Sequence, residues 1–185
     1  FTPTGGDFTG SSTASDLTQD VNKNPSTTTL AVSPSGSSVF GQPVTLTATV
    51  TSGATGTVTF KNGAATLGTG AISGNQATFA TSTLALGSYS FTAEYGGDAT
   101  YLVSSSAAEA HTIGQASTST TVASDVNPSN IGALVTFTAT VSPPYTGTPS
   151  GDVLFSIDGS PVGSPVTLVG GVATYATSAL AAGPH

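Results

Sequence analysis

Nine carboxylates are the side chains of this sequence that could hold a divalent cation. Calcium requires several oxygen ligands that converge from one region of a fold. Asp98 follows a Gly-Gly pair, and Asp125 lies just past the junction between two repeated segments, so these two residues are the candidates for a calcium ion that stiffens the junction. The alternative is that Asp98 accepts hydrogen bonds from backbone N–H groups in a turn. We expect no cofactor, and calcium at Asp98 and Asp125 stays open as an alternative.

Catalytic candidates are few in this sequence. The two histidines, His111 and His185, lie in different repeated segments, and we expect His111 at the surface or rim of a strand. Ser and Thr occur throughout the chain, so the nearness of a hydroxyl to an acid says nothing about a nucleophile. There is no cysteine, no G-x-S-x-G motif, no phosphate-binding loop and no zinc-ligand spacing. We therefore expect that the protein is not an enzyme.

The net charge of −7, with Lys23 and Lys61 as the only lysines or arginines, argues against two classes of partner. Nucleic acid is disfavoured because two cations cannot neutralise a row of phosphates. An anionic membrane surface is disfavoured for the same reason. No apolar run approaches the roughly 18 residues of a membrane-spanning helix, so we expect no membrane insertion.

Apolar side chains alternate with Thr and Ser over short segments, as they do in strands with one solvent-facing side. In residues 43–51 the expected inward set is Val44, Leu46, Ala48 and Val50. In residues 88–95 it is Tyr89, Phe91, Ala93 and Tyr95. Val58 and Phe60 form a third inward set, before the turn signal Asn62-Gly63.

Seven such segments are separated by turn residues about every 10 to 12 positions, which is typical of an antiparallel sandwich. They are residues 27–32, 43–51, 56–63, 65–68, 75–82, 88–95 and 107–113. No stretch has a convincing helical period. The sequence therefore predicts an all-β fold.

The chain also repeats itself. "FGQPVTLTATV" at residues 40–50 returns as "IGALVTFTATV" at residues 131–141, and "ATFATSTLALG" at 77–87 returns as "ATYATSALAAG" at 173–183. The repeat is about 91 to 96 residues long, because "PPYTGTPS" at 143–150 lengthens one loop of the later copy. The sequence thus predicts β-sandwiches in tandem.

The ordered segments "TTL", "GQPVTLTATV", "GTVTF" and "ATFATSTLALGSYSFTAEYGGD" resemble the bacterial Ig-like repeat family. The resemblance covers essentially the whole chain and implies tandem Ig-like antiparallel β-sandwiches. Such repeats occur in arrays on exported, cell-surface and biofilm-associated proteins. The resemblance therefore implies an extracellular or cell-surface location and a spacer or adhesive module, with no catalytic residues to carry over.

One short motif resembles the tyrosine corner of such sandwiches, where a Tyr hydroxyl bonds back to the backbone and fixes the turn into a central strand. This motif is "LALGSY", which ends at Tyr89. The later repeat has "LAAGPH" instead, so His185 stands where Tyr89 stands in the earlier repeat.

The repeats divide the chain into three parts: residues 1–23 as the C-terminal strands of a preceding or neighbouring repeat, 24–116 as a complete Ig-like domain, and 117–185 as an incomplete domain that lacks its last two strands. "TGGDFTG" at 4–10 resembles "YGGDATY" at 95–101 and supports the first assignment. Because the lost strand would carry three aromatic positions, we expect the incomplete domain to expose a core groove and open strand edges.

We expect residues 1–23 to complete the sandwich of residues 117–185, in a neighbouring molecule or in a continued chain. The residues expected at this contact are Phe1, Phe8, Leu17, Val21, Leu180 and His185. This contact would make the chain a structural subunit or repeating segment of an extracellular filament, whose partners are copies of itself or adjacent repeats. The alternative is a stalk or adhesin fragment of a bacterial surface protein that binds carbohydrate or presents another domain. A third explanation is an arbitrary fragment whose two ends match by chance.

Overall fold

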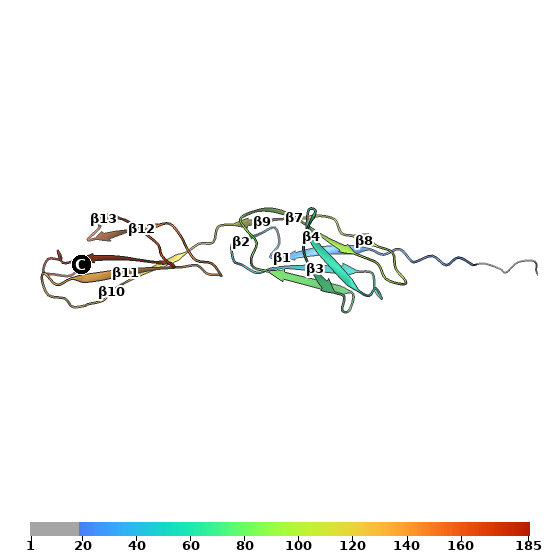
Figure 1. Ribbon diagram of the computed structural model, residues 1–185, viewed down its shortest axis with the longest axis horizontal. Coiled ribbons are helices and arrows are strands. Elements are labelled where there is room, and N and C mark those ends of the chain that lie inside the picture. The colour runs from blue at the N-terminus through green and yellow to red at the C-terminus, as the bar shows by residue number, and fades with distance from the viewer. Residues whose placement is uncertain (1–18) are drawn as a thin grey trace, which may run out of the picture.

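A computed structural model describes residues 19–185 of the chain, and this part contains fourteen β-strands. The strands form two successive units, which Figure 1 shows end to end along the long axis of the molecule. The first unit contains β1 to β9 and the second contains β10 to β14. Within the described residues, no helix is long and apolar enough to cross a membrane.

The first unit is a sandwich of two sheets. The smaller sheet has the order β1-β3-β6, with bounds Thr28–Ser33, Val44–Val50 and Gln76–Thr81. The larger sheet has the order β2-β9-β7-β4-β5, with β8 paired to β7. Its bounds are β2 Ser37–Val39, β4 Thr57–Asn62, β5 Ala65–Ala71, β7 Gly87–Tyr95, β8 Ser104–Ser105 and β9 Glu109–Gly114. All pairs between these strands are antiparallel except β2 with β9, which is parallel.

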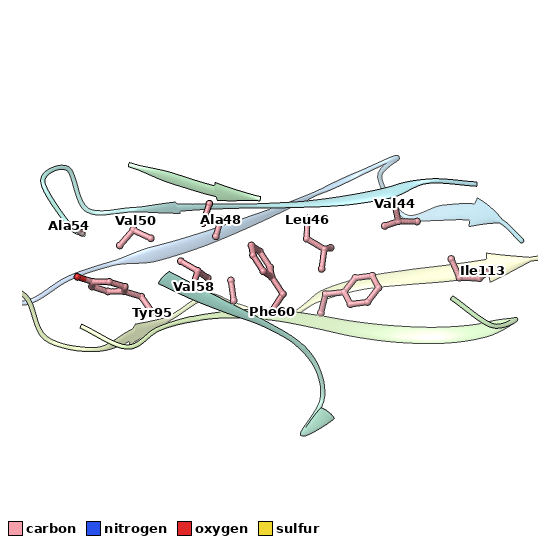
Figure 2. Close-up of a cluster of buried hydrophobic side chains, with 12 residues drawn as sticks. Val44, Leu46, Ala48, Val50, Ala54, Val58, Phe60, Tyr95 and Ile113 are labelled. Carbon is pink, nitrogen blue, oxygen red and sulfur yellow. The ribbon is translucent and has the colours of Figure 1, made fainter. Parts of the chain in front are cut away.

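The core of the first unit lies between these two sheets, as Figure 2 shows. It contains twelve buried apolar side chains, and the expected inward residues of β3 are among them with exposed fractions of 2% or less. Val58, Phe60, Phe91 and Tyr95 are buried as well, which confirms the inward faces predicted for β4 and β7. Full burial of an apolar side chain of this size contributes roughly 1.5–3 kcal/mol, so this set accounts for much of the unit's stability.

The second unit repeats five of these strands. Its sheet β10-β11-β14 matches β1-β3-β6, with bounds Ser119–Ser124, Val135–Ser142 and Val172–Thr177. Its other sheet contains β12 (Asp152–Ile157) and β13 (Ser160–Thr167), which match β4 and β5. The described chain supplies no counterpart of β7 or β9 here. Residues 128–130, which correspond to β2, form no strand, because β2 depends on β9 as its pairing partner.

The position of His111 corrects the expectation from sequence. Its side chain is only 1% exposed, not at the surface or rim, and its ring lies 5.9 Å from the ring of Phe91. Its Nε2 atom is 2.9 Å from the Ser38 hydroxyl on β2. The parallel strand β2 covers this end of β9, and sequence alternation alone does not reveal such a short strand. Burial lowers the pKa of His111, because the charged imidazolium loses its hydration.

Candidate assembly surface

The second unit has an open sheet edge along β12. In the first unit, the matching strand β4 lies between β5 and β7, and Val58 and Phe60 pair with Tyr95 and Ala93 of β7. In the second unit, β12 pairs with β13 alone among the described strands. The backbone N–H and C=O groups on its other edge are therefore available to a further strand.

A cavity of about 370 Å³ lies beside this open edge. It is lined by residues of β10, β11, β12 and β14, including Val122, Phe137, Phe155 and Tyr175. Val122 is 60% exposed, although it faces Ala139 as the half-buried Leu30 faces Ala48 in the first unit. The surface that a complete sandwich would bury is thus open to solvent. This cavity and the open edge of β12 together form a groove in the second unit.

The two sheets of the second unit nevertheless pack against each other as the two sheets of the first unit do. The rings of Phe155 and Tyr175 stack with centroids 5.7 Å apart, as Phe60 and Phe79 stack at 6.0 Å. The buried core is smaller, with Ala139, Phe155 and Ala173 in place of the twelve buried residues of the first unit. The floor of the groove is therefore already in the arrangement that the complete sandwich uses.

The corner motif that leads into β7 in the first unit is present in both units. In the first unit, the Tyr89 hydroxyl donates a 2.8 Å hydrogen bond to the carbonyl of Ala85, which confirms the predicted tyrosine corner. In the second unit, Nε2 of His185 donates a 3.0 Å bond to the carbonyl of Ala181, four residues back as in the tyrosine corner. His185 thus takes over the bond that a Tyr makes in the first unit.

The second nitrogen of His185 has an acidic partner. Its Nδ1 atom is 2.9 Å from Oδ2 of Asp158 in the turn between β12 and β13. The carbonyl of Ala181 and the carboxylate of Asp158 together raise the pKa of His185, because both favour a ring that donates from both nitrogens. The imidazolium form therefore fastens the corner to the β12–β13 turn.

The structure brings together two of the six expected contact residues. Leu180 and His185 line a hollow of about 300 Å³ with Tyr175, close to the open edge. Val21 is 88% exposed, and the blue segment that leads into β1 lies at the opposite end of the molecule from the second unit (Figure 1). Phe1, Phe8 and Leu17 lie outside the described residues. In this chain Val21 therefore does not reach the groove beside its own second unit.

The repeated architecture is matched by a known sequence family. The family described as bacterial Ig-like domain (group 3) matches residues 30–114 and 120–185. The chain belongs to this family. Ig-like domains of this kind are modules of bacterial surface-type proteins and are typically structural rather than enzymatic.

Solved structures also resemble the tandem Ig-like chain, at low overall superposition. The fibronectin(III)-like modules of Clostridium thermocellum CbhA match with a TM-score of 0.39 and 22% identity, over 83% of this chain and 79% of that chain. The human OSCAR ligand-binding domain matches with a TM-score of 0.38 and 15% identity, over 82% of this chain and 81% of that chain. No curated protein matches the chain significantly.

Asp98 of the first Ig-like unit has its carboxylate occupied by protein donors. Oδ1 accepts 2.7 Å bonds from the backbone N–H groups of Thr100 and Tyr101, and Oδ2 accepts bonds from the N–H and hydroxyl of Thr55 at 2.9 and 3.0 Å. These bonds hold the pKa of Asp98 well below its usual range, the backbone N–H of Thr55 having the largest effect. They match the alternative in which Asp98 accepts hydrogen bonds from backbone N–H groups in a turn, and they tie the end of β7 to the β3–β4 loop.

Asp125 of the second unit also accepts a hydrogen bond from a backbone N–H group. Its Oδ1 accepts a 2.8 Å bond from the backbone N–H of Thr136, and this bond is the main reason that its pKa is lowered. Asp125 follows β10, whereas Asp98 follows β7 of the other Ig-like unit. Among the described residues, no three His, Cys, Asp or Glu side chains form a group that could hold a metal ion. Calcium at these two residues stays a prediction without a supporting ligand cluster.

Sequence reasoning missed Asp158 and Val122 as parts of the groove. Asp158 stands in an ordinary turn signal, Asp-Gly, and its role depends on the corner histidine 27 positions later. Val122 lies in a segment whose exposure follows from the missing opposite strands rather than from its own sequence. The one sequence signal for this region was the alignment of His185 with Tyr89, which correctly predicted the position of the corner in the second unit.

Proposed function

We propose that this chain is a structural segment of an extracellular filament, in which a strand from residues 1–23 of a neighbouring copy or repeat completes the open Ig-like unit. The observation that carries the proposal is the open edge of β12 beside a cavity of about 370 Å³. Strand addition to such an edge supplies main-chain hydrogen bonds, and the cavity receives alternate side chains.

The size of the missing contribution explains why the groove needs an occupant. In the first unit, Phe91, Ala93 and Tyr95 of β7 are buried to 1% exposure or less. Burial of each aromatic side chain is worth roughly 1.5–3 kcal/mol, against a total stability of about 5–15 kcal/mol for a domain. A unit without these residues is therefore weakened and presents apolar surface to a partner.

The positions of the donated strand and of the groove that accepts it determine whether the assembly is closed or open-ended. The described segment before β1 lies at the opposite end of the molecule from the second unit, which contains the groove (Figure 1), so the donated strand and its acceptor belong to different surfaces. A contact between two different surfaces does not close on itself and continues from copy to copy. The same geometry describes a long tandem array in which the strand comes from the continued backbone.

Deletion of residues 1–23 tests the proposal. We expect the 185-residue chain to form filaments in electron microscopy and large species in sedimentation velocity, and the deleted chain to stay monomeric. A peptide of residues 1–23, added in excess to the full chain, should occupy the grooves and shorten the filaments, whereas a scrambled peptide should not. Unchanged filaments from the deleted chain would refute the donated strand. Monomers that bind glycans would favour the stalk or adhesin alternative.

A further inference from the structure

The loop between β11 and β12 touches the first Ig-like unit. The hydroxyl of Thr146 lies 3.4 Å from the carbonyl oxygen of Gly41 in the turn after β2. Gly147 lies against the ring of Phe40, so that a β-carbon added to Gly147 would be 3.0 Å from the ring. A cavity of about 400 Å³ beside this contact is lined by both units, including Phe40, Leu86, Pro143, Thr146 and Pro149.

The backbones of the two units approach closely at Gly41. A β-carbon at Gly41 would lie 2.2 Å from the carbonyl oxygen of Thr146, which is backbone and cannot swing away. Gly41 has a φ of +80°, and its counterpart in the second unit, Gly132, has a φ of +79°. A β-carbon at Gly132 would meet nothing within 4 Å. The two glycines thus have nearly the same φ, and only Gly41 is in contact with a neighbouring unit.

The matching loop of the first unit is bound to its own domain. This loop, residues 51–55, is shorter than residues 142–150, and Asp98 binds the N–H and hydroxyl of Thr55. The Tyr101 hydroxyl donates a 3.1 Å bond to the carbonyl of Ser52. The extra residues of the later loop therefore extend toward the preceding unit, where the shorter loop is tied back.

From these contacts we infer that the loop at residues 143–149 is a docking element, which seats on the Phe40–Gly41 turn of the preceding Ig-like unit and holds the two units in one orientation. The partner that this loop fits is the end of a sandwich that presents a glycine turn. The default for two domains joined by a small interface is relative motion, so the loop changes a flexible junction into a fixed one. This inference stands apart from the donated strand, because neither of its surfaces includes residues 1–23.

Gly41→Ala and Gly132→Ala form a matched pair for the test. Both substitutions place a β-carbon at nearly the same positive φ and carry the same backbone strain. Only Gly41→Ala also meets the loop of the other unit. A second variant replaces residues 142–150 by residues 51–55, which removes the docking element without changing the turn at Gly41.

The readout is the distance between spin labels on the two units, in the full chain. The sequence has no cysteine, so Thr69→Cys and Ser164→Cys, both exposed, give one label on each unit. We expect one narrow distance distribution for the parent chain and for Gly132→Ala. Because undocked domains move freely, the distribution should widen about two-fold or more in Gly41→Ala and in the loop-replaced chain. Thermal unfolding confirms that both units remain folded.

Distance distributions of equal width for Gly41→Ala, Gly132→Ala and the loop-replaced chain would overturn the inference that the loop docks. A parent chain that already shows a broad distribution would overturn it as well. A narrow distribution in a chain that does not form filaments would support the docked junction and count against the donated strand, so the two proposals fail separately.

Discussion

Tyr89 and His185 show how one local bond can be made by two side chains. Both close a corner by bonding to a carbonyl four residues earlier, at 2.8 and 3.0 Å. The tyrosine makes this bond through its hydroxyl alone, whereas the histidine also bonds to Asp158 through its second ring nitrogen. At this scale, the clearest tests remove one polar group and follow the stability of one unit.

Tyr89→Phe should destabilise the first unit by about 0.5–1.5 kcal/mol, the usual net contribution of a hydrogen bond. The substitution removes the hydroxyl that bonds to Ala85 and keeps the ring that stacks on Phe91. Urea unfolding measures the change. Tyr145→Phe removes the same group from a 41% exposed ring of the second unit and should leave the first unit unchanged. Equal effects of the two substitutions would contradict the corner's role.

Asp98→Ala should lower the unfolding temperature of the first unit, because four hydrogen-bond donors lose their acceptor. The folded state depresses the pKa of Asp98, so its contribution is present above the ordinary Asp pKa of about 3.9 and is lost as pH falls below it. In acid the parent chain and Asp98→Ala should converge. Thermal scans from neutral to acid pH test this, with the exposed Glu109→Ala as control. A constant difference at all pH values would speak against it.

The buried His111 should make the first unit less stable as pH falls below about 6.5. Its folded pKa is lowered, so in that range the unfolded state binds a proton that the folded state excludes. His111→Gln cannot titrate and should remove this pH dependence, whereas His185→Gln should leave it in place. The measurement is the urea midpoint of the first unit from pH 8 to pH 5, an interval that spans the ordinary His pKa of about 6.5. An unchanged slope in His111→Gln would exclude His111 as its source.

At the scale of elements, β4 and β12 are equivalent strands of the two repeats that have different neighbours. β4 has neighbours on both sides and contributes Phe60, which is 0% exposed. β12 has one neighbour in the described chain and contributes Phe155, which is 7% exposed beside an open cavity. The difference in stability between the units should therefore follow from the missing strands rather than from the residues of β12.

Phe60→Ala should cost the first unit about 3–5 kcal/mol, as large-to-small changes in a closed core do. Phe155→Ala should cost the second unit clearly less in the isolated chain, because its ring is packed on fewer sides. Urea unfolding, followed by amide signals of each unit, gives both values. In assembled material the cost of Phe155→Ala should rise toward that of Phe60→Ala. Equal costs in the isolated chain would mean that the second core is already closed.

Alternation and repetition in the sequence predicted the seven main strands of the first unit and the inward faces of β3, β4 and β7. In residues 43–51, for example, the pattern identified Val44, Leu46, Ala48 and Val50, and all four are buried. The strands β2 and β8 escaped prediction because three and two residues are too few to show a period. The prediction that His111 lies at the surface was wrong for the same reason, because β2 is the strand that covers it. The docking of the later loop escaped because a contact between two units leaves no periodic pattern.

At the scale of the whole molecule, the chain is two Ig-like units end to end with unlike poles. The segment that leads into β1 lies at one pole (Figure 1), and the second unit, where Leu180 and His185 line a hollow, lies at the other. In the filament that we propose, head-to-tail addition joins these poles and leaves the inferred docking between the two units unchanged. The net charge of −7 opposes close approach of copies, so the contact between poles must be supplied by backbone pairing and apolar burial.

The most direct test of the donated strand is its register. Val58 pairs with Tyr95 in the first unit, Val153 takes the place of Val58, and the repeat aligns Thr4 with Tyr95. In a cysteine-free chain, Thr4→Cys and Val153→Cys can be prepared separately, mixed, assembled and oxidised. We predict a disulfide between the two chains, and none when Thr167→Cys on β13 replaces Val153→Cys. Assembled material with no such disulfide, or with equal crosslinking at Thr167, would contradict the account.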